Sequence, residues 1–378
     1  MVLSSNIQVQ DFRYAKKNSE SISEHSELAL RKINNEVQVG RIAGPFIEPP
    51  FPTLRVSPIF LASKKNNEFR LIHNLSHPSE NSLNDFIDPE CCSVRYAGID
   101  DALVMIKRIG KGGMLAKADI KSTFRLLKMA PSDFDQLGFR FERKYYFDKC
   151  LPMGASISCS IFENFSTALH WFTELQCHNK NILHYLDDFL LGGPAESPLC
   201  QIILDTFRDV CKTWGVPLAE DKTVEPVQIL TFLGIEFDIL KRELRLSSEK
   251  ISEIKITLEL FMHVMKVTLR QLQSLIGLLN FACQVIAPGW AFCRRLVDAT
   301  CGVRKAHHKI RISKSIKEDL IIWKTFLSNY NGVTVMLDTA CTSADSIEFF
   351  TDSVGDKQGF RNIFSGSMGT SKLAKRVG

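Results

Sequence analysis

The 378-residue sequence lacks several features that mark specialised classes of protein. Its 11 cysteines include no C-x-x-C pair, and their odd number does not suit a secreted disulfide framework. No apolar stretch of the kind found in a signal peptide follows the N-terminal residues. The sequence also has no internal repeat and no low-complexity tract. These absences argue against a zinc module and a secreted scaffold, and they predict an intracellular location, with cytoplasm and nucleus not distinguished.

One uncharged stretch, residues 271–293, does not have the composition of a membrane span. It contains glutamine, serine and asparagine, and Pro288-Gly289 interrupts it. No apolar core of about 18 residues remains, which is the length that a spanning helix needs. We expect a buried helix here and no contact between the protein and a membrane.

Composition and charge favour a folded chain with one basic region. Hydrophobic residues make up 45% and charged residues 24% of the chain, as in globular proteins, and the length predicts two to three domains. The net charge is only +5, but residues 241–330 carry 16 Lys and Arg against 7 Asp and Glu, a net of +9. Such a block fits a phosphate backbone, although a solvated helix face would give the same pattern.

The hydrophobic pattern predicts an α+β core followed by a mostly helical region. Apolar periodicity and turn residues divide the chain into alternating helices and strands. Their order is typical of a split-βαβ arrangement. We expect helices at residues 21–34, 98–110, 156–175, 199–214 and within 251–330, a strand leading into a helix at 114–127, and strands at 59–75, 182–191, 229–246 and 346–351.

The amphipathic helix expected at residues 156–175 has a well-defined stripe. Five apolar residues share one face, while four polar residues lie elsewhere on the helix. We therefore predict that the apolar stripe is the buried one. The apolar residues are Ile157, Ile161, Phe165, Leu169 and Phe172, and the polar residues are Glu163, Thr167, His170 and Glu174.

Two groups of aspartates are the first candidates for chemistry. Asp187-Asp188 joins two apolar strands in the segment ILHYLDDFLL, and Asp119 lies on the polar face of the strand MLAKADI together with Lys117. Adjacent carboxylates repel each other, and Mg²⁺ prefers one or two carboxylates plus substrate phosphates. If the two strands are neighbours, Asp119 and Asp187 can share two metal ions about 3.5–4 Å apart, the arrangement for phosphoryl transfer. The alternative is an ordinary Asp-Asp surface turn beside an unrelated strand.

Six segments in order resemble reverse transcriptases. Tyr185-Leu186-Asp187-Asp188 is similar to the family's Y-x-D-D motif, and AKADIKSTF is similar to the first catalytic-aspartate motif. Three segments most resemble the DIRS-type, tyrosine-recombinase retrotransposons. Their sequences are RIAGPF, RLIHNLSHPSENSLNDFI and LRQLQSLIGLLNFACQVIAPGWAFCRRL. The other matching segments are SPIFLASKKNNEFRLIHNLS, LPMGASISCSIF, WGVPLAEDKT and LTFLGIEFD.

The resemblance implies a right-hand polymerase with fingers, a ferredoxin-like palm and a thumb. We expect an N-terminal extension with one helix at 1–45, fingers and palm at 46–240, and a helical thumb or connection at 241–335. Residues 345–378 resemble the start of a ribonuclease H domain. The substrates implied are an RNA template, a DNA primer and dNTPs, with the oligomeric state left open.

Catalytic roles follow from the same resemblance. Asp119 and Asp187 would hold two Mg²⁺ ions, with Mn²⁺ as the alternative metal, and Asp188 would be a third, less essential acid at the metal site. Lys222 would protonate the leaving pyrophosphate. All four residues are therefore expected to be catalytic.

Substrate-binding residues come from the fingers hairpin and the first motif. Arg70, with Lys64 or Lys65, would hold the incoming triphosphate, because Arg contacts phosphate in bidentate fashion and Lys acts as a point charge. Phe124, five residues after Asp119, would be the steric gate that excludes a ribose 2′-OH. A core phenylalanine is the alternative at that position.

Further contacts are expected around the base pair and the primer. Met153, Gly154 and Tyr185 belong to the substrate-binding set, and Gly154 would allow close approach of the backbone to the base pair. An ordinary helix entry would explain the same segment. The primer grip would be formed by Phe232, Leu233 and Gly234.

The C-terminal segment leads to two interpretations of the whole chain. Asp352, in IEFFTDSVGDKQGF, resembles the first acid of ribonuclease H, but the remaining acids of that fold are not present, so we expect no such activity. The leading hypothesis is an RNA-directed DNA polymerase. The alternative is a catalytically silent retroelement remnant that keeps the fold and binds nucleic acid. An RNA-dependent RNA polymerase is disfavoured by Phe124.

Overall fold

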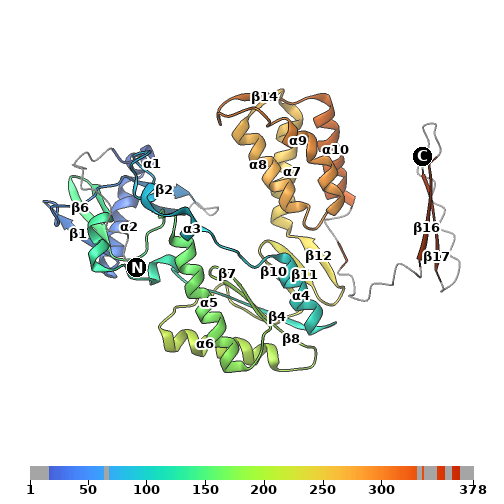
Figure 1. The fold of residues 1–378 in the computed structure, drawn as a ribbon, viewed down its shortest axis with the longest axis horizontal. Coiled ribbons are helices and arrows are strands. Elements are labelled where there is room, and N and C mark those ends of the chain that lie inside the picture. The colour runs from blue at the N-terminus through green and yellow to red at the C-terminus, as the bar shows by residue number, and fades with distance from the viewer. Residues whose placement is uncertain (1–16, 64–67, 330–333, 336–346, 354–359, 367–378) are drawn as a thin grey trace. The chain divides into compact units, whose positions relative to one another are not determined.

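The computed structural model describes residues 17–63, 68–329, 334–335, 347–353 and 360–366. The chain divides into a large unit, residues 1–334, and a small unit, residues 335–378. The large unit contains the α+β core and the helical region that the sequence predicts (Figure 1).

The fingers region combines the N-terminal helices with two small sheets. Strands β2 and β3 form the predicted antiparallel hairpin, and β1, β6 and β5 pair in that order. Ile33 from α2 is buried in the same apolar core as Ile59 and Phe139, so the N-terminal helices belong to this core. The elements are α1 (Glu20–Glu24), α2 (Ser26–Gln38), β1 (Ile42–Phe46), β2 (Ile59–Ser63), β3 (Phe69–His73), β5 (Gly138–Phe141) and β6 (Lys144–Asp148).

The palm is a four-stranded antiparallel sheet in the order β7-β8-β4-β9. Ala116, Ala118 and Ile120 of the β4 segment pack with α5 and α6 on one face, as their spacing predicts. On the other face Gly192 lies against Met105 and Ile109 of α4, so the sheet is covered on both sides (Figure 1). The elements are α4 (Ile99–Ile109), β4 (Met114–Asp119), α5 (Ser158–Cys177), β7 (Ile182–Tyr185), β8 (Asp188–Gly193), α6 (Leu199–Trp214) and β9 (Val224–Val227).

Short elements connect the fingers to the palm. The expected helix after β4 is instead one turn of 3-10 helix, η2, because Ser122 and Thr123 adopt positive φ angles directly after the strand. These elements are η1 (Leu83–Phe86), α3 (Pro89–Cys92), η2 (Thr123–Leu126) and η3 (Pro131–Gln136).

A small sheet leads from the palm into the helical thumb. Its strands β10, β11 and β12 pair in sequence order (Figure 1). Helices α7, α8, α9 and α10 and the 3-10 turn η4 follow. Two three-residue strands, β13 and β14, pair within this region and were not expected from the sequence. The elements are β10 (Ile229–Phe232), β11 (Ile235–Asp238), β12 (Glu243–Leu246), α7 (Ser248–His263), β13 (Lys266–Thr268), α8 (Leu269–Ala282), η4 (Ala287–Phe292), α9 (Arg294–Asp298), β14 (Lys309–Arg311), α10 (Lys314–Asn329) and β15 (Thr334–Val335).

Helix ends in the core follow capping chemistry. Gly215 ends α6 in the left-handed region, with φ +69°, a conformation that favours glycine. Thr268 begins α8 and forms reciprocal hydrogen bonds with Gln271. The uncharged stretch 271–293 forms most of α8 and the whole of η4. None of the described helices combines the length and the apolar composition needed to cross a bilayer.

The buried face of α5 differs from the predicted stripe. Phe162, Ser166 and Thr173 are buried with Leu169, whereas Ile161 is only half-buried. Glu163, which we placed on the polar face, is also buried. The reason is that α5 contacts both the palm sheet and α6, so its buried arc is wider than one apolar stripe and includes small and polar side chains.

The small unit, described by itself, is an antiparallel pair of strands. They are β16 (Ile347–Ser353), close to the predicted strand, and β17 (Phe360–Gly366), which was not expected. Asp352 lies in β16, opposite Arg361 in the backbone register. The ribonuclease H-like assignment of this segment stays a prediction.

Candidate active site

The acidic residues meet at one edge of the palm sheet. Strands β7 and β8 are joined by the two-residue turn Leu186-Asp187, in which Leu186 has a φ of +54°. Strand β4 pairs with β8 so that Asp119 is opposite Asp188. The N–H of Ile120 donates to the carbonyl oxygen of Asp187 at 3.0 Å, which fixes the turn against β4. The two strands are therefore neighbours, which is the condition that the sequence analysis set for a shared site.

Each of the three carboxylates has a polar partner. The Nζ of Lys222 lies 3.2 Å from both oxygens of Asp119. The hydroxyl of Thr123 donates to Asp187 Oδ2 at 2.8 Å. The Nζ of Lys117 lies 3.0 Å from Asp188 Oδ1, so Lys117 and the acids share one face of the sheet.

Burial and neighbouring charges perturb two of these groups. Burial raises the pKa of Asp119, the Lys222 ammonium opposes this, and the carboxylates of Asp187 and Asp188 raise it further. Burial lowers the pKa of Lys222, but the hydrogen bond and charge of Asp119 outweigh this and raise it overall. The like-charge contribution at Asp119 is the repulsion that a bound divalent cation would relieve.

The carboxylates are suited to a Mg²⁺ site that substrate completes. Among the described residues, no group of three His, Cys, Asp or Glu side chains is arranged to hold a metal ion. Asp119 and Asp187 both line the cavity described below, whereas Asp188 is paired with Lys117 and is not among the lining residues. Two carboxylates plus substrate phosphates are a sufficient ligand set for Mg²⁺. The donor chemistry therefore fits such a metal.

A cavity of about 550 Å³ lies beside these acids, within the size range of small-molecule sites. Its wall is formed by the acidic edge of the palm, the fingers strand β3 and helix α2. Lys32, Arg70 and Lys121 are the lining cations without an acidic partner among the described residues. These cations give the cavity that Asp119 and Asp187 also line a free positive charge.

The other lining cations are held in ion pairs. Arg41 pairs with Glu36 at 3.5 Å, and Lys222 pairs with Asp119. Arg125 Nη2 lies 3.0 Å from Glu36 and 2.6 Å from Asp148. The Arg125 side chain is 11% exposed and connects α2, η2 and β6 at the wall of the cavity.

The fingers residues expected to bind triphosphate divide into two groups. Arg70 is exposed on β3 and lines the cavity. Lys64 and Lys65 lie outside the described residues. The predicted role of the hairpin therefore depends, within the described chain, on Arg70.

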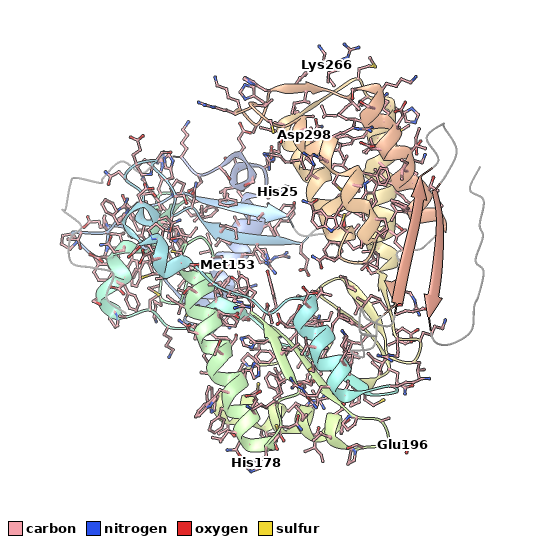
Figure 2. All side chains as sticks on the ribbon, turned by 45° about the vertical axis from the view of Figure 1, so that its right-hand side comes forward. His25, Met153, His178, Glu196, Lys266 and Asp298 are labelled. Atoms are coloured by element: carbon pink, nitrogen blue, oxygen red, sulfur yellow. The ribbon has the colours of Figure 1, made fainter. Side chains whose placement is uncertain are left out.

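Gly154 is required by contact with the fingers, and its predicted approach to a base pair stays a prediction. Its φ is +135°, and a Cβ atom at this position would lie 1.9 Å from the carbonyl oxygen of His73. The preceding carbonyl, of Met153, accepts the N–H of His73 at 3.1 Å. Met153 also lines the cavity, near the start of α5 (Figure 2). A glycine is needed here because two backbones meet, a reason that the sequence could not reveal.

Phe124 and Tyr185 lie at the margin of the palm core. Phe124 is half-buried, and its ring contacts Phe162 edge-on with centroids 5.6 Å apart. Its neighbours Thr123 and Arg125 line the cavity. Tyr185, also half-buried, packs against Tyr96 with centroids 4.6 Å apart.

The residues predicted to grip the primer form the tip of the β10–β11 hairpin. Leu233 and Gly234 have positive φ angles, as a tight hairpin turn requires. Phe232 is completely buried, so its side chain serves the core. Gly234 lies next to Phe281 of α8, which places the turn against the thumb.

Several residues of the site were missed by sequence reasoning. Lys32 and Glu36 lie in the segment that we expected to be an extension, yet they line the cavity. Arg125 and Asp148 meet only because η2 and β6 are neighbours in the fold. A charged residue inside the apolar run TFRLL was the single available signal, because a buried Arg needs an acidic partner.

Comparison with known proteins identifies the family that this site resembles. Residues 63–237 match the family described as "Reverse transcriptase (RNA-dependent DNA polymerase)". The chain is 24% identical over 225 residues to "Protein P" of heron hepatitis B virus, covering 59% of this chain and 27% of that protein. It is 27% identical over 176 residues to the "Putative enzymatic polyprotein" of cassava vein mosaic virus, covering 47% and 25%. The chain thus spans about a quarter of these relatives.

Solved structures show the same fold. The foamy viral protease-reverse transcriptase in complex with dsDNA has a TM-score of 0.62 at 15% identity, covering 97% of this chain and 68% of that one. A second structure, of the dRH form with ds DNA, has a TM-score of 0.60 at 16% identity, covering 95% and 56%. The predicted α+β polymerase fold is therefore confirmed.

Proposed function

We propose that the chain is an RNA-directed DNA polymerase that extends a primer 3′-OH with dNTPs. The observation that carries the proposal is that Asp119 and the Asp187 turn meet at one sheet edge, where both aspartates line a cavity with unpaired cations. In-line phosphoryl transfer needs acids that bind metal on one side and positive charge for the phosphates on the other. The match of residues 63–237 supports the same activity.

Asp119 and Asp187 are the residues that would hold two Mg²⁺ ions, or Mn²⁺ in their place. Bound there, the ions would lower the pKa of the attacking hydroxyl and neutralise the charge of the phosphates. Asp188, paired with Lys117, supports the acidic edge from β8. The chain's own part is to hold these carboxylates at the sheet edge before substrate arrives.

Other lining residues would bind and orient the nucleotide. Arg70 would take the triphosphate, joined by Lys32 and Lys121 and by Lys64 or Lys65, since these side chains carry the charge that it requires. Lys222 would donate a proton from Nζ to pyrophosphate; its raised pKa keeps it protonated at neutral pH. Phe124 would limit the space beside the sugar, and Met153 and Tyr185 would contact the base pair.

The remaining assignments are part of the same proposal. The thumb would bind the duplex through its basic surface, and Leu233 and Gly234 would contact the primer backbone. The sequences of the segments that resemble DIRS-type elements support an origin in a retrotransposon of that type. Residues 345–378 would be a ribonuclease H-like segment, and the activity that we propose for the described site is that of a polymerase.

Primer extension tests the proposal. The purified chain should extend oligo(dT) on poly(rA) with dTTP and Mg²⁺, and a chelator should stop the reaction. Replacement of dTTP by UTP should give little product, because the proposed gate excludes the 2′-OH. If a folded chain binds the duplex but never extends it, the silent-remnant alternative replaces the proposal. Preferential use of UTP would indicate an RNA polymerase.

A further inference from the structure

A buried carboxylate lies directly behind the turn that carries Asp187. Glu163 of α5 is 8% exposed, and its Oε2 accepts the N–H of Leu186 at 3.1 Å. Leu186 is the first residue of the turn and has a positive φ. A backbone N–H that is partly shielded from water still requires an acceptor, so this bond favours the observed turn over other conformations. The turn is thus held from β4 on one side and from α5 on the other.

A chain of side chains holds Glu163 in place. Its Oε1 lies 3.3 Å from Nε2 of His184, the residue that precedes Tyr185. Nδ1 of His184 lies 2.8 Å from Nδ1 of His170, and Nε2 of His170 lies 3.3 Å from Oε1 of Glu174. This series of side-chain contacts runs from the half-buried Glu174 inward to the turn. It connects α5 to β7 through four titratable groups.

The short contact between the two histidines restricts their protons. One Nδ1 must donate and the other must accept. In one arrangement His184 donates through Nε2 to the Glu163 carboxylate, and a cationic His170 donates to both His184 and Glu174. In the other, protonated Glu163 donates to His184, whose Nδ1–H donates to a neutral His170. Both arrangements contain the same number of protons and leave an oxygen of Glu163 free to accept the Leu186 N–H.

The electrostatics of the cluster favour the second arrangement, because burial lowers the pKa of His170 more than the nearby Glu174 raises it, which disfavours a cationic His170. Burial, followed by the charge of His170, lowers the pKa of His184 to about 4, so this ring is neutral near pH 7. Burial raises the pKa of Glu163, and the Leu186 hydrogen bond opposes that rise. His184 is neutral in each arrangement, so the bond to the turn persists while the proton moves along the chain.

We propose that Glu163, supported by His184 and His170, is a positioning residue that fixes the Leu186-Asp187 turn for catalysis. Glu163 is not among the residues that line the cavity, so it acts through the backbone and does not touch substrate. The expected effect is on the placement of Asp187, which follows the bonded N–H. This inference rests on the proposed polymerase function for its activity readout.

Two substitutions separate the hydrogen bond from packing. Glu163→Gln keeps an acceptor for Leu186, and its amide can donate to His184 if the histidine protons take the second arrangement. Glu163→Leu keeps similar volume but removes the acceptor. Since a small misplacement of reacting groups can cost about 100-fold in rate, we expect kcat to fall at least about tenfold in Glu163→Leu. Glu163→Gln should retain kcat within about threefold, a difference of less than 1 kcal/mol.

Steady-state extension on poly(rA)/oligo(dT) should show a change in kcat with KM for dTTP nearly unchanged. Asn164→Leu, on the exposed side of α5, is the matched control and should resemble the wild type. Wild-type kcat in Glu163→Leu would overturn the proposal, as would equal losses in the Gln and Leu variants. If Glu163→Leu does not fold, His184→Asn replaces it and should give a smaller fall in kcat that Glu163→Gln does not share.

Hydrogen exchange of the Leu186 amide provides a readout independent of activity. We expect slow exchange in the wild type and in Glu163→Gln, and much faster exchange in Glu163→Leu. An inactive wild type with this exchange pattern would refute the polymerase function but not the role of Glu163 in fixing the turn. Equal exchange in all three proteins would refute the positioning role even if the wild type extends primers.

Discussion

The palm edge and the thumb use charge in opposite ways. At the palm edge, Asp119 is paired with Lys222 and Asp188 with Lys117. In the described part of the thumb, the cations of the β13–β14 ribbon have no acidic partner. Its register places Lys266 opposite Arg311, and the next pair, Val267 and Ile310, is buried. Lys266 lies at one end of the helical region (Figure 2). The ion pairs hold the palm carboxylates in fixed positions. The unpaired cations of the ribbon are free to bind a phosphate backbone.

Loss of an acid that we propose to bind metal should have the largest effect at the palm edge. In Asp119→Asn the carboxylate that pairs with Lys222 becomes a neutral amide, a much weaker metal ligand. We expect extension to fall by more than about 100-fold, because a bound metal contributes several kcal/mol of transition-state stabilisation. Single-turnover extension at saturating dTTP measures this. A decrease of less than tenfold would contradict the role given to Asp119.

Removal of the palm lysine should have the next largest effect. Lys222→Met removes the proposed proton donor while retaining the length of the side chain. General acid catalysis contributes about 10²–10⁴-fold, so we expect kcat to fall by about the lower of these factors. Lys212→Met, on the last turn of α6, is the matched control. An unchanged kcat in Lys222→Met would limit its role to pairing with Asp119.

Neutralising the thumb ribbon should weaken binding without changing chemistry. Lys309 and Arg311 are exposed cations of β14. In the double Ala variant we expect duplex affinity to fall several-fold at 0.1 M salt, and the salt slope to decrease by about 0.9 for each phosphate that these two side chains neutralise in the wild type. Fluorescence anisotropy across salt concentrations measures both. Lys324→Ala, whose lysine pairs with Glu259, should change neither.

The smallest effect concerns stability in acid. Folding lowers the pKa of His184 from 6.5 to about 4, chiefly by burial. Between these values the unfolded chain binds a proton that the folded chain does not, so this stabilisation is complete above pH 6.5 and is lost as pH falls toward 4. At pH 5 the wild type should lose about 2 kcal/mol that His184→Gln retains.

Urea unfolding at pH 7.5 and pH 5 measures this difference. His307→Gln, in the exposed part of the thumb, serves as the control and should show the wild-type dependence on pH. Parallel pH curves for the wild type and His184→Gln would contradict the assigned shift.

The acidic edge could be predicted because its signals are local. The alternation in MLAKADI places Asp119 on the polar face of a strand, and the Asp-Asp pair between apolar strands places Asp187 at a turn. That the two strands are neighbours was a condition that only the fold could meet. Glu163 could not be predicted in the same way, since its helical position lies off the apolar stripe and its partner is a backbone N–H on another element. The close contact of Gly154 with His73, and the Arg125 ion pairs, likewise exist only after the fingers and palm have packed.

The assignment of Asp187 to the catalytic site is tested most directly by comparing the same substitution at two aspartates in different surroundings. Asp187→Asn changes the turn at the sheet edge, and Asp209→Asn changes an exposed carboxylate on α6. Both variants should fold and bind the poly(rA)/oligo(dT) duplex. We predict that Asp209→Asn extends the primer at the wild-type rate and that Asp187→Asn gives no detectable product. Equal extension by the two variants would contradict the assignment of the catalytic site.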